Sequence, residues 1–176
     1  MDVKIAEAHA ALLADETGTV RKEHGGRVRV ALIYPNTYYV GMSSLGFQRV
    51  YELINAVPWA VAERAFLPDR ALAARYADSG EPLRTLESNT PVRDFDLIAF
   101  STSFEMDYPH IIKILRACRL EPLASRRGPK DPLVVGGGVA MWINPEPVAE
   151  LFDAVLLGEA EGLIEELLEA LRSGAS

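Results

Sequence analysis

Runs of apolar residues that stop abruptly at a turn are the feature that most constrains how this chain can fold. The clearest run covers residues 96–101, and the run over residues 27–34 becomes wholly apolar as it proceeds. Such runs, which lack polar alternation, are typical of parallel strands that are buried on both faces of a sheet. We therefore expect five strands, over residues 27–34, 59–67, 96–101, 132–135 and 154–157.

Apolar residues recur at helical spacing between these runs. Ile111, Ile114, Leu115 and Cys118 share one helical face, and Pro109 suits the first turn of that helix. On that face, Cys118 is most simply a small core residue. Helices are expected over residues 4–14, 47–57 (with Ser43 or Ser44 as N-cap), 71–78, 109–118, 145–152 and 163–171, and a short extra strand over residues 83–86.

Strands that alternate with helices indicate an α/β fold with right-handed crossovers. The sequence predicts a three-layer, doubly wound, parallel five-stranded sheet in the flavodoxin-like order 2-1-3-4-5. Residues 1–26 would form an N-terminal helix and connector, in which His24 is expected to be exposed, and residues 27–173 would form a Rossmann-type domain. Ligands bind such sheets beyond the carboxyl ends of the strands. The loops of interest are residues 36–44, 101–107, 136–144 and 158–161.

Charge and cysteine content narrow the range of functions. The net charge of −7 argues against nucleic-acid binding, and the basic cluster Arg126, Arg127 and Lys130 is interpreted as a solvated loop. One cysteine cannot alone hold a disulfide, a multi-cysteine zinc site or an iron–sulfur cluster, and it fits a reducing compartment. No apolar stretch approaches the roughly 18 residues of a membrane span. We expect a cytoplasmic protein without a metal site or catalytic residues of its own.

Several familiar motifs are missing at the expected strand ends. The first strand is followed by neither G-x-G-x-x-G nor a P-loop, and G-x-S-x-G fails because Leu45 replaces the last glycine. The histidines do not suit a serine triad, because His9 and His24 precede the sheet and His110 begins a helix. These absences argue against a nucleotide-binding enzyme and against a hydrolase.

A triglycine, Gly136 to Gly138, follows the fourth predicted strand. It would let a bulky ligand approach the backbone, or it would serve a turn that needs positive φ.

Tyr38 and Tyr39 in the first loop could stack on a ligand or cover the sheet end. Carboxylates also gather at this edge, where they favour helix N-termini at least as readily as a metal or acid–base pair. They are Glu105, Asp107, Glu146, Glu159 and Glu161.

Taken together, these loops resemble the N-terminal part of a group of radical S-adenosylmethionine (SAM) proteins. Each matching stretch is weak by itself, but five in the same order make a specific match over about residues 16–170. The stretches are residues 34–46, 63–69, 85–88, 95–108, and the set made by 135–138, 144–147 and 157–161.

The resemblance implies that this module precedes a radical SAM barrel. That barrel carries C-x-x-x-C-x-x-C, which holds a 4Fe-4S cluster and S-adenosylmethionine. The three-cysteine motif is absent here, so the cluster and S-adenosylmethionine are expected only in the C-terminal part of a longer parent protein, and the barrel is the expected partner. This chain alone is not expected to perform radical chemistry.

The same resemblance implies a cobalamin-binding-like fold. In that fold, D-x-H-x-x-G after the first strand supplies a histidine to cobalt, whereas here the spacing reads Asn36, Tyr38, Gly41. A phenol is a poor cobalt ligand, so histidine-type ligation is not expected. The expected cofactor contacts are Asn36, Thr37, Tyr38, Gly41, Ser101, Thr102, Ser103, Gly136, Gly137, Gly138, Gly158 and Glu159.

Three readings remain open at this point. The module binds cobalamin, it is a scaffold without cofactor that docks on the barrel, or it is a free-standing flavodoxin-like regulatory or binding domain. Cobalamin binding separates the first reading from the second.

Overall fold

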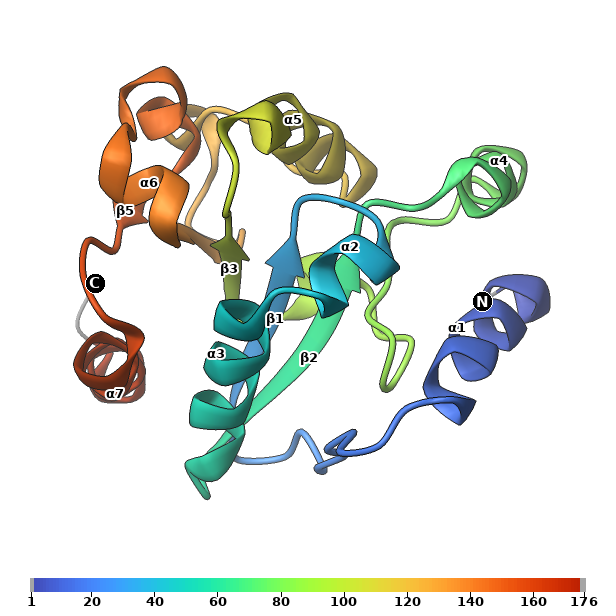
Figure 1. Cartoon of the computed structure of the whole chain (residues 1–176), viewed down its shortest axis with the longest axis horizontal. Helices are drawn as coiled ribbons and strands as arrows, with labels where there is room; N and C mark the ends of the chain where they lie inside the picture. The colour runs from blue at the N-terminus through green and yellow to red at the C-terminus, as the bar shows by residue number, and fades with distance from the viewer. Residues whose placement is uncertain (1, 175–176) are drawn as a thin grey trace.

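The computed structural model describes residues 2–174 and contains one five-stranded sheet. All neighbouring strands are parallel, and their order is β2-β1-β3-β4-β5, which confirms the predicted flavodoxin-like topology (Figure 1). The strands are β1 (Val28–Tyr34), β2 (Ala60–Phe66), β3 (Leu97–Ser101), β4 (Leu133–Gly137) and β5 (Ala154–Val155).

Helices cover both faces of this sheet, with α3 and α7 on one side and α5 and α6 on the other (Figure 1). The Ser44 side chain accepts a hydrogen bond from the Phe47 N–H at 3.4 Å, so Ser44 is the N-cap of α3. The α-helices are α1 (Val3–Ala14), α2 (Tyr38–Met42), α3 (Leu45–Ala56), α4 (Arg70–Ser79), α5 (Tyr108–Ala117), α6 (Val139–Ile143) and α7 (Ala160–Ser173). The 3₁₀ helices are η1 (Val92–Asp94), η2 (Glu105–Asp107), η3 (Ala124–Arg126) and η4 (Glu146–Leu151).

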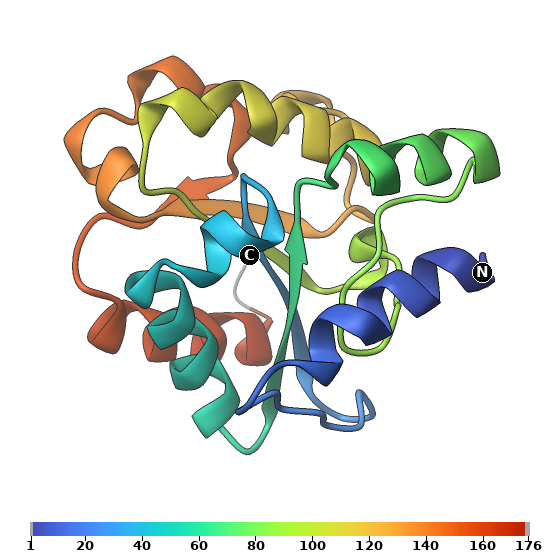
Figure 2. The ribbon, with the colours of Figure 1, turned by 45° about the vertical axis from the view of Figure 1, so that its right-hand side comes forward.

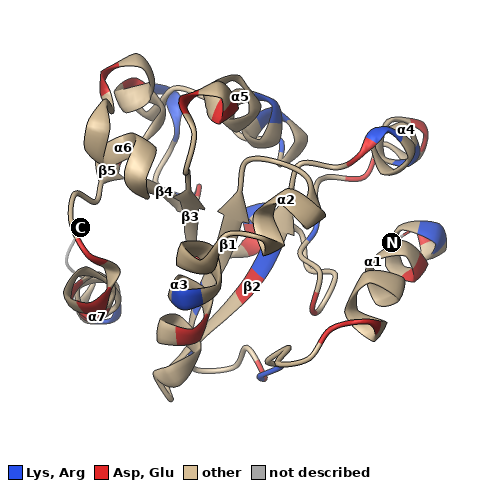
Figure 3. Ribbon diagram, in the orientation of Figure 1, with Lys and Arg blue, Asp and Glu red and all other residues tan. Residues whose placement is uncertain are grey.

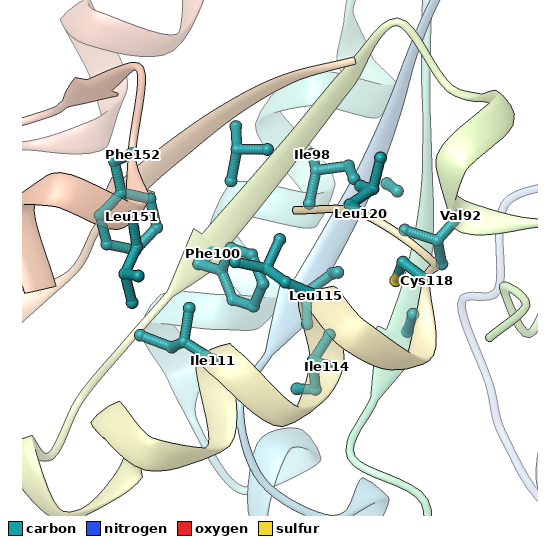
Figure 4. Close-up of a cluster of buried hydrophobic side chains, with 14 of the residues drawn as sticks. Val92, Ile98, Phe100, Ile111, Ile114, Leu115, Cys118, Leu120, Leu151 and Phe152 are labelled. Carbon is teal, nitrogen blue, oxygen red and sulfur yellow. The ribbon is translucent and has the colours of Figure 1, made fainter. Parts of the chain in front are cut away.

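Alternate residues of each strand enter two separate cores. Ile98 and Phe100 of β3 pack with the apolar stripe of α5 and with Phe152, whereas Leu97 and Ala99 face α3 and α7. Cys118 is fully buried in the α5 core, as its place on the helical stripe predicts (Figure 4). Burial on both faces explains why the strands read as continuous apolar runs.

The structure corrects four details of the predicted elements. Residues 83–86 form no strand, because the only pairing there is one antiparallel bridge between Arg84 and Pro91. The loops over residues 36–44 and 136–144 are not plain loops, since they contain the short helices α2 and α6. β5 pairs over two residues rather than four, and the helix predicted over residues 145–152 is the 3₁₀ helix η4.

The N-terminal segment packs along the β2 edge of the sheet (Figure 2). α1 buries Ile5 and His9, and Nζ of Lys22 donates hydrogen bonds of 2.6–3.0 Å to three carbonyl oxygens around the end of α3. His24 was expected to be exposed, but its side chain is 26% exposed and its Nε2 donates to Oε1 of buried Glu63 at 2.7 Å. That carboxylate on the edge strand draws the ring inward.

The expectation of a solvated basic loop is wrong for Arg127. Its side chain is 3% exposed, and it donates to the carbonyl oxygens of Glu121, Pro122 and Leu151 and to the carboxylate of Asp153. Arg127 therefore holds the loop after α5 against η4.

Within residues 2–174, no helix is both long enough and apolar enough to cross a bilayer.

Candidate functional site

A cavity of about 170 Å³ opens between α3 and α7 at the carboxyl ends of β1, β3 and β4. Its floor is formed by the strands, through side chains such as Leu32 and Ala99 and the backbone of the triglycine. Val50 of α3 and Leu163 of α7 supply apolar walls. Four of the residues that the sequence nominated line it: Ser101, Gly137, Gly138 and Gly158.

The three glycines of the triglycine have different roles. A Cβ on Gly136 would approach the Phe152 ring to 3.0 Å, so this glycine makes room for the core. Gly138 has a φ of +98°, and a Cβ there would lie 2.5 Å from the carbonyl oxygen of Thr102. Gly137 lines the cavity, and a Cβ there would meet only ordinary contacts of 3.8 Å or more. The interpretation as a turn that needs positive φ therefore holds for Gly138, whereas Gly137 leaves the cavity wall without a side chain.

The loop after β3 is tied to the triglycine through its backbone. The N–H of Thr102 donates to the carbonyl of Gly137 at 2.9 Å, and the carbonyl of Thr102 accepts from the Ala140 N–H at 3.2 Å. The Thr102 hydroxyl is buried and has no hydrogen-bond partner among the described residues. Ser103 follows, half-buried, and lines neither the α3–α7 cavity nor the second cavity described below. The strand ends thus meet as one rigid edge.

Asn36, directly after β1, contacts the loop after β3. Its Nδ2 donates to Oδ1 of Asp107 at 2.7 Å, and its own Oδ1 accepts from the Thr37 N–H. His110 Nδ1 lies 3.4 Å from the same carboxylate oxygen and donates to the Pro35 carbonyl. Oδ2 of Asp107 is buried and has no hydrogen-bond partner in the part of the chain that the structure describes.

Tyr38 stands where the cobalamin motif has histidine, and its hydroxyl is already engaged. It donates a hydrogen bond to Oε1 of Glu16 at 2.5 Å, while Glu16 also accepts from Arg64 at 2.7 and 3.0 Å. Burial and the neighbouring Glu16 carboxylate raise the pKa of the Tyr38 phenol. Gly41, on the same helix, packs so tightly that a Cβ would lie 2.4 Å from the Phe66 ring.

The structure therefore separates the nominated residues into two groups. Thr37 and Tyr38 line a second cavity of about 150 Å³, bounded by α1, α2 and α4, and not the α3–α7 cavity. His9 forms part of that second cavity, and its Nδ1 donates to Oδ1 of Asn89 at 2.7 Å. Burial lowers the pKa of His9, which favours the neutral ring. Glu159 is exposed and precedes α7 without a side-chain capping bond.

The carboxylates at this edge do not assemble into a metal site. Within residues 2–174, no three His, Cys, Asp or Glu side chains are placed to hold one ion. Glu161 instead accepts from Nε of Arg49 at 3.1 Å, which joins α7 to α3 beside the cavity. Glu105 lies in the first turn of η2 and Glu146 in the first turn of η4, where a carboxylate favours the helix N-terminus.

Large apolar side chains stand exposed around the same edge. We call this set the apolar rim, and its members are 50–85% exposed. They lie in or beside the segments that follow β1, β3, β4 and β5. Its members are Tyr39, Leu45, Phe104, Met106, Val139, Trp142, Ile143 and Leu157. Exposed apolar side chains gathered at one edge of a fold are typical of a surface that contacts another molecule.

Sequence reasoning missed the helical walls of the cavity. Val50 and Leu163 belong to amphipathic stripes that read simply as core, and Gly46 and Leu156 carry no ligand signal. The available signal was the fold itself, because open parallel sheets bind ligands in the crevice outside the carboxyl ends of their strands.

Comparison with known proteins supplies the family. The family model described as "Radical SAM proteins, N-terminal" matches residues 46–176. The uncharacterized protein MJ0966 of Methanocaldococcus jannaschii is 29% identical over 133 residues, which are 76% of this chain and 24% of that protein. The chain thus spans about a quarter of the length of this relative. With well over half of its residues matched by the family model, the chain belongs to the family of N-terminal domains of radical SAM proteins.

Proposed function

We propose that this chain is the cobalamin-binding-like module of a larger radical SAM protein, and that the α3–α7 cavity receives the nucleotide tail of cobalamin. The observation that carries the proposal is an apolar cavity bordered by side-chain-free backbone at Gly137, at the edge where such sheets bind ligands. The residues that would hold the tail are Ser101, Gly137, Gly138 and Gly158 with the walls of α3 and α7.

The cavity suits a flat aromatic base. Apolar cavities of roughly 150 Å³ accept benzene, so about 170 Å³ is enough for an aromatic ring entering from the open side. Thr102 Oγ1 and Asp107 Oδ2 lack partners among the described residues, and a buried polar atom without a partner is unfavourable. An amide group of the corrin could relieve that cost after a small rearrangement.

Cobalt would receive no ligand from this chain at position 38. The Tyr38 hydroxyl is committed to Glu16, and Tyr38 lines the second cavity rather than the first. When bound, cobalamin would supply a cobalt centre able to carry an alkyl group. The chain's own contribution is to hold the tail and present the corrin at the apolar rim.

The proposed partner is the radical SAM barrel of the parent protein, docked on the apolar rim. Trp142 and Met106 are 67% and 85% exposed, and isolated apolar groups of this size are costly in water. The barrel would hold the 4Fe-4S cluster and S-adenosylmethionine, since this chain has one cysteine and Cys118 is buried. A free thiol and such a cluster both suit the reducing cytoplasm.

The test is a titration of the purified chain with hydroxocobalamin and methylcobalamin, followed by visible absorption and by calorimetry. Three variants are compared: Gly137→Val, which fills the cavity; Gly137→Ala, whose Cβ has room; and Gly25→Val, a connector glycine whose Cβ would meet nothing within 4 Å. Circular dichroism and thermal unfolding check that each variant folds.

Saturable one-to-one binding that Gly137→Val weakens at least tenfold, while Gly25→Val leaves it unchanged, would support the proposal. If Gly137→Val binds cobalamin as strongly as the native chain, the α3–α7 cavity is not the binding site. No binding to the chain, followed by none to the parent protein, would leave a scaffold that docks on the barrel without cofactor.

A further inference from the structure

Basic residues are concentrated in one stretch of an otherwise acidic chain. Residues 113–130 contain six Lys or Arg side chains and one acidic side chain, whereas the whole chain carries a net charge of −7. The stretch comprises the second half of α5, the 3₁₀ helix η3 and most of the connection from α5 to β4. Figure 3 shows its basic positions on α5. The overall charge therefore hides a local positive surface.

The fold turns this stretch into a groove. Lys113 and Arg116 are exposed on α5, Arg119 is exposed in the turn that follows the helix, and Arg126 is exposed in η3. Arg116, Arg119 and Arg126 line a cavity of about 670 Å³. Apolar side chains, such as Leu120 and Leu151, line the same cavity between these arginines. A guanidinium group carries five N–H donors, which suit it to binding phosphate oxygens.

Buried Arg127 builds one wall of this groove. It holds the carbonyl oxygens of Glu121, Pro122 and Leu151, and all three residues line the groove. On the other side, Arg119 donates to the Gly80 carbonyl at the end of α4. These side chain-to-backbone hydrogen bonds hold the groove in place before any ligand arrives, which lowers the entropy cost of binding.

We propose that this basic groove binds the phosphodiester backbone of a nucleic acid. Lys113 and Arg116 are separated by a rise of about 4.5 Å along α5. Arg119 and Arg126 extend the basic surface beyond the end of that helix, so it is larger than one phosphate group. Basic residues gathered along a helix are the electrostatic footprint of a nucleic-acid surface. No aromatic residue lines the groove, so base stacking plays no part and contact is with the backbone.

Two acidic residues, Glu121 and Asp131, also line the groove and reduce its positive charge. Asp131 accepts a hydrogen bond from the Gly128 N–H at 2.9 Å, and Glu121 is exposed. The groove lies on the α5 face of the sheet, whereas the α3–α7 cavity lies on the opposite face. Nucleic acid and cofactor would therefore occupy separate surfaces, and this proposal stands independently of the cobalamin proposal.

The experiment is fluorescence anisotropy of the 176-residue chain with a labelled 20-nucleotide single-stranded RNA at 50, 100 and 200 mM salt. Single-stranded and duplex DNA of the same sequence show which nucleic acid is preferred. The test variant is Arg116→Ala/Arg126→Ala. The control, Arg21→Ala/Arg75→Ala, removes the same charge from exposed residues outside the groove.

We expect the groove variant to bind about tenfold more weakly than the control variant and the log–log salt slope to fall by about 1.4, or about 0.7 for each lost phosphate contact. Equal weakening in both variants would mean that overall charge alone is sensed and would overturn the proposal. So would absence of RNA and DNA binding at 100 μM protein in 50 mM salt. Tighter binding of labelled polyglutamate than of any nucleic acid would assign the groove to an acidic protein segment instead.

Discussion

The Tyr38 hydroxyl donates a 2.5 Å hydrogen bond to Glu16, and this contact joins the first loop of the sheet to the N-terminal connector. Glu16 in turn pairs with Arg64 of the edge strand, whose Nε also donates to Glu87. The side chain at the position of a cobalt ligand in related folds therefore belongs to a buried polar network. That network fixes the connector on the sheet.

Tyr38→Phe removes the hydroxyl from this network without changing the ring. We expect the free energy of unfolding to fall by about 1 kcal/mol, because Glu16 loses one donor but keeps Arg64. Cobalamin affinity and the visible spectrum of the bound form should not change. Urea titration and absorption titration measure the two quantities. A changed cobalt spectrum in Tyr38→Phe would place the phenol at the metal and contradict the geometry.

Glu16→Gln should make stability less dependent on acid pH. Burial opposes ionisation of Glu16, but hydrogen bonds from Arg64, Tyr38 and Thr19 outweigh it and hold its pKa below the ordinary 4.5. A depressed pKa gives stability that is complete above the unfolded value and is lost as pH falls through the folded value. At pH 7 the free energy of unfolding of the native chain should be about 2 kcal/mol larger than that of Glu16→Gln. This difference should shrink toward pH 3. Urea unfolding across this range measures it, and a gap that stays constant would refute the prediction.

Gly138→Ala and Gly137→Ala should differ sharply in stability. At position 138 the added methyl would meet the Thr102 carbonyl at 2.5 Å at a φ of +98°, so a loss of about 2–4 kcal/mol is expected. At position 137 the nearest atoms are 3.8 Å away, and the change should stay within about 1 kcal/mol. Chemical denaturation of both variants provides the comparison. Similar losses at the two positions would mean that the edge can shift to accept a side chain.

Adjacent arginines give a matched pair of charge deletions. Arg127→Met removes the guanidinium donor from three carbonyl groups and the ion-pair partner from Asp153, which keeps only the Val134 N–H of its two described donors. A cost of about 3 kcal/mol is expected. Arg126→Met removes an exposed side chain and should change stability by less than about 0.5 kcal/mol. Thermal unfolding monitored by circular dichroism separates the two. Equal effects would show that Arg127 is not held as described.

The sheet was predictable because strands that are buried on both faces consist of continuous runs of apolar residues. The β1 and β3 runs are apolar over their whole buried length, and their order follows from the alternation with helices. β2 was harder, because buried Glu63 and Arg64 interrupt its apolar pattern. Those two charges are paired with residues from the connector and from residues 85–88, and such long-range pairing cannot be read from local sequence.

The sequence was enough to predict where in the fold the candidate site lies, but not which side chains line it. Strand ends indicated Ser101, Gly137 and Gly158, and these do line one cavity. The motif analogy also placed Tyr38 with them, yet its ring turns toward α1 because Glu16 and Arg64 provide buried partners. Spacing in a sequence gives a backbone position, whereas side-chain direction depends on partners that are distant in the chain.

The two margins of the sheet are closed in different ways. The connector lies along β2, where Lys22 donates to the Ala60 carbonyl and His24 donates to the Glu63 carboxylate. At the other edge, β5 pairs through only two residues. Unpaired strand margins are templates for aggregation, and both short margins and covered margins suppress it. The 176-residue chain should therefore resist strand-by-strand polymerisation. Any self-association should occur through the apolar rim and be reversed by mild detergent rather than by denaturant.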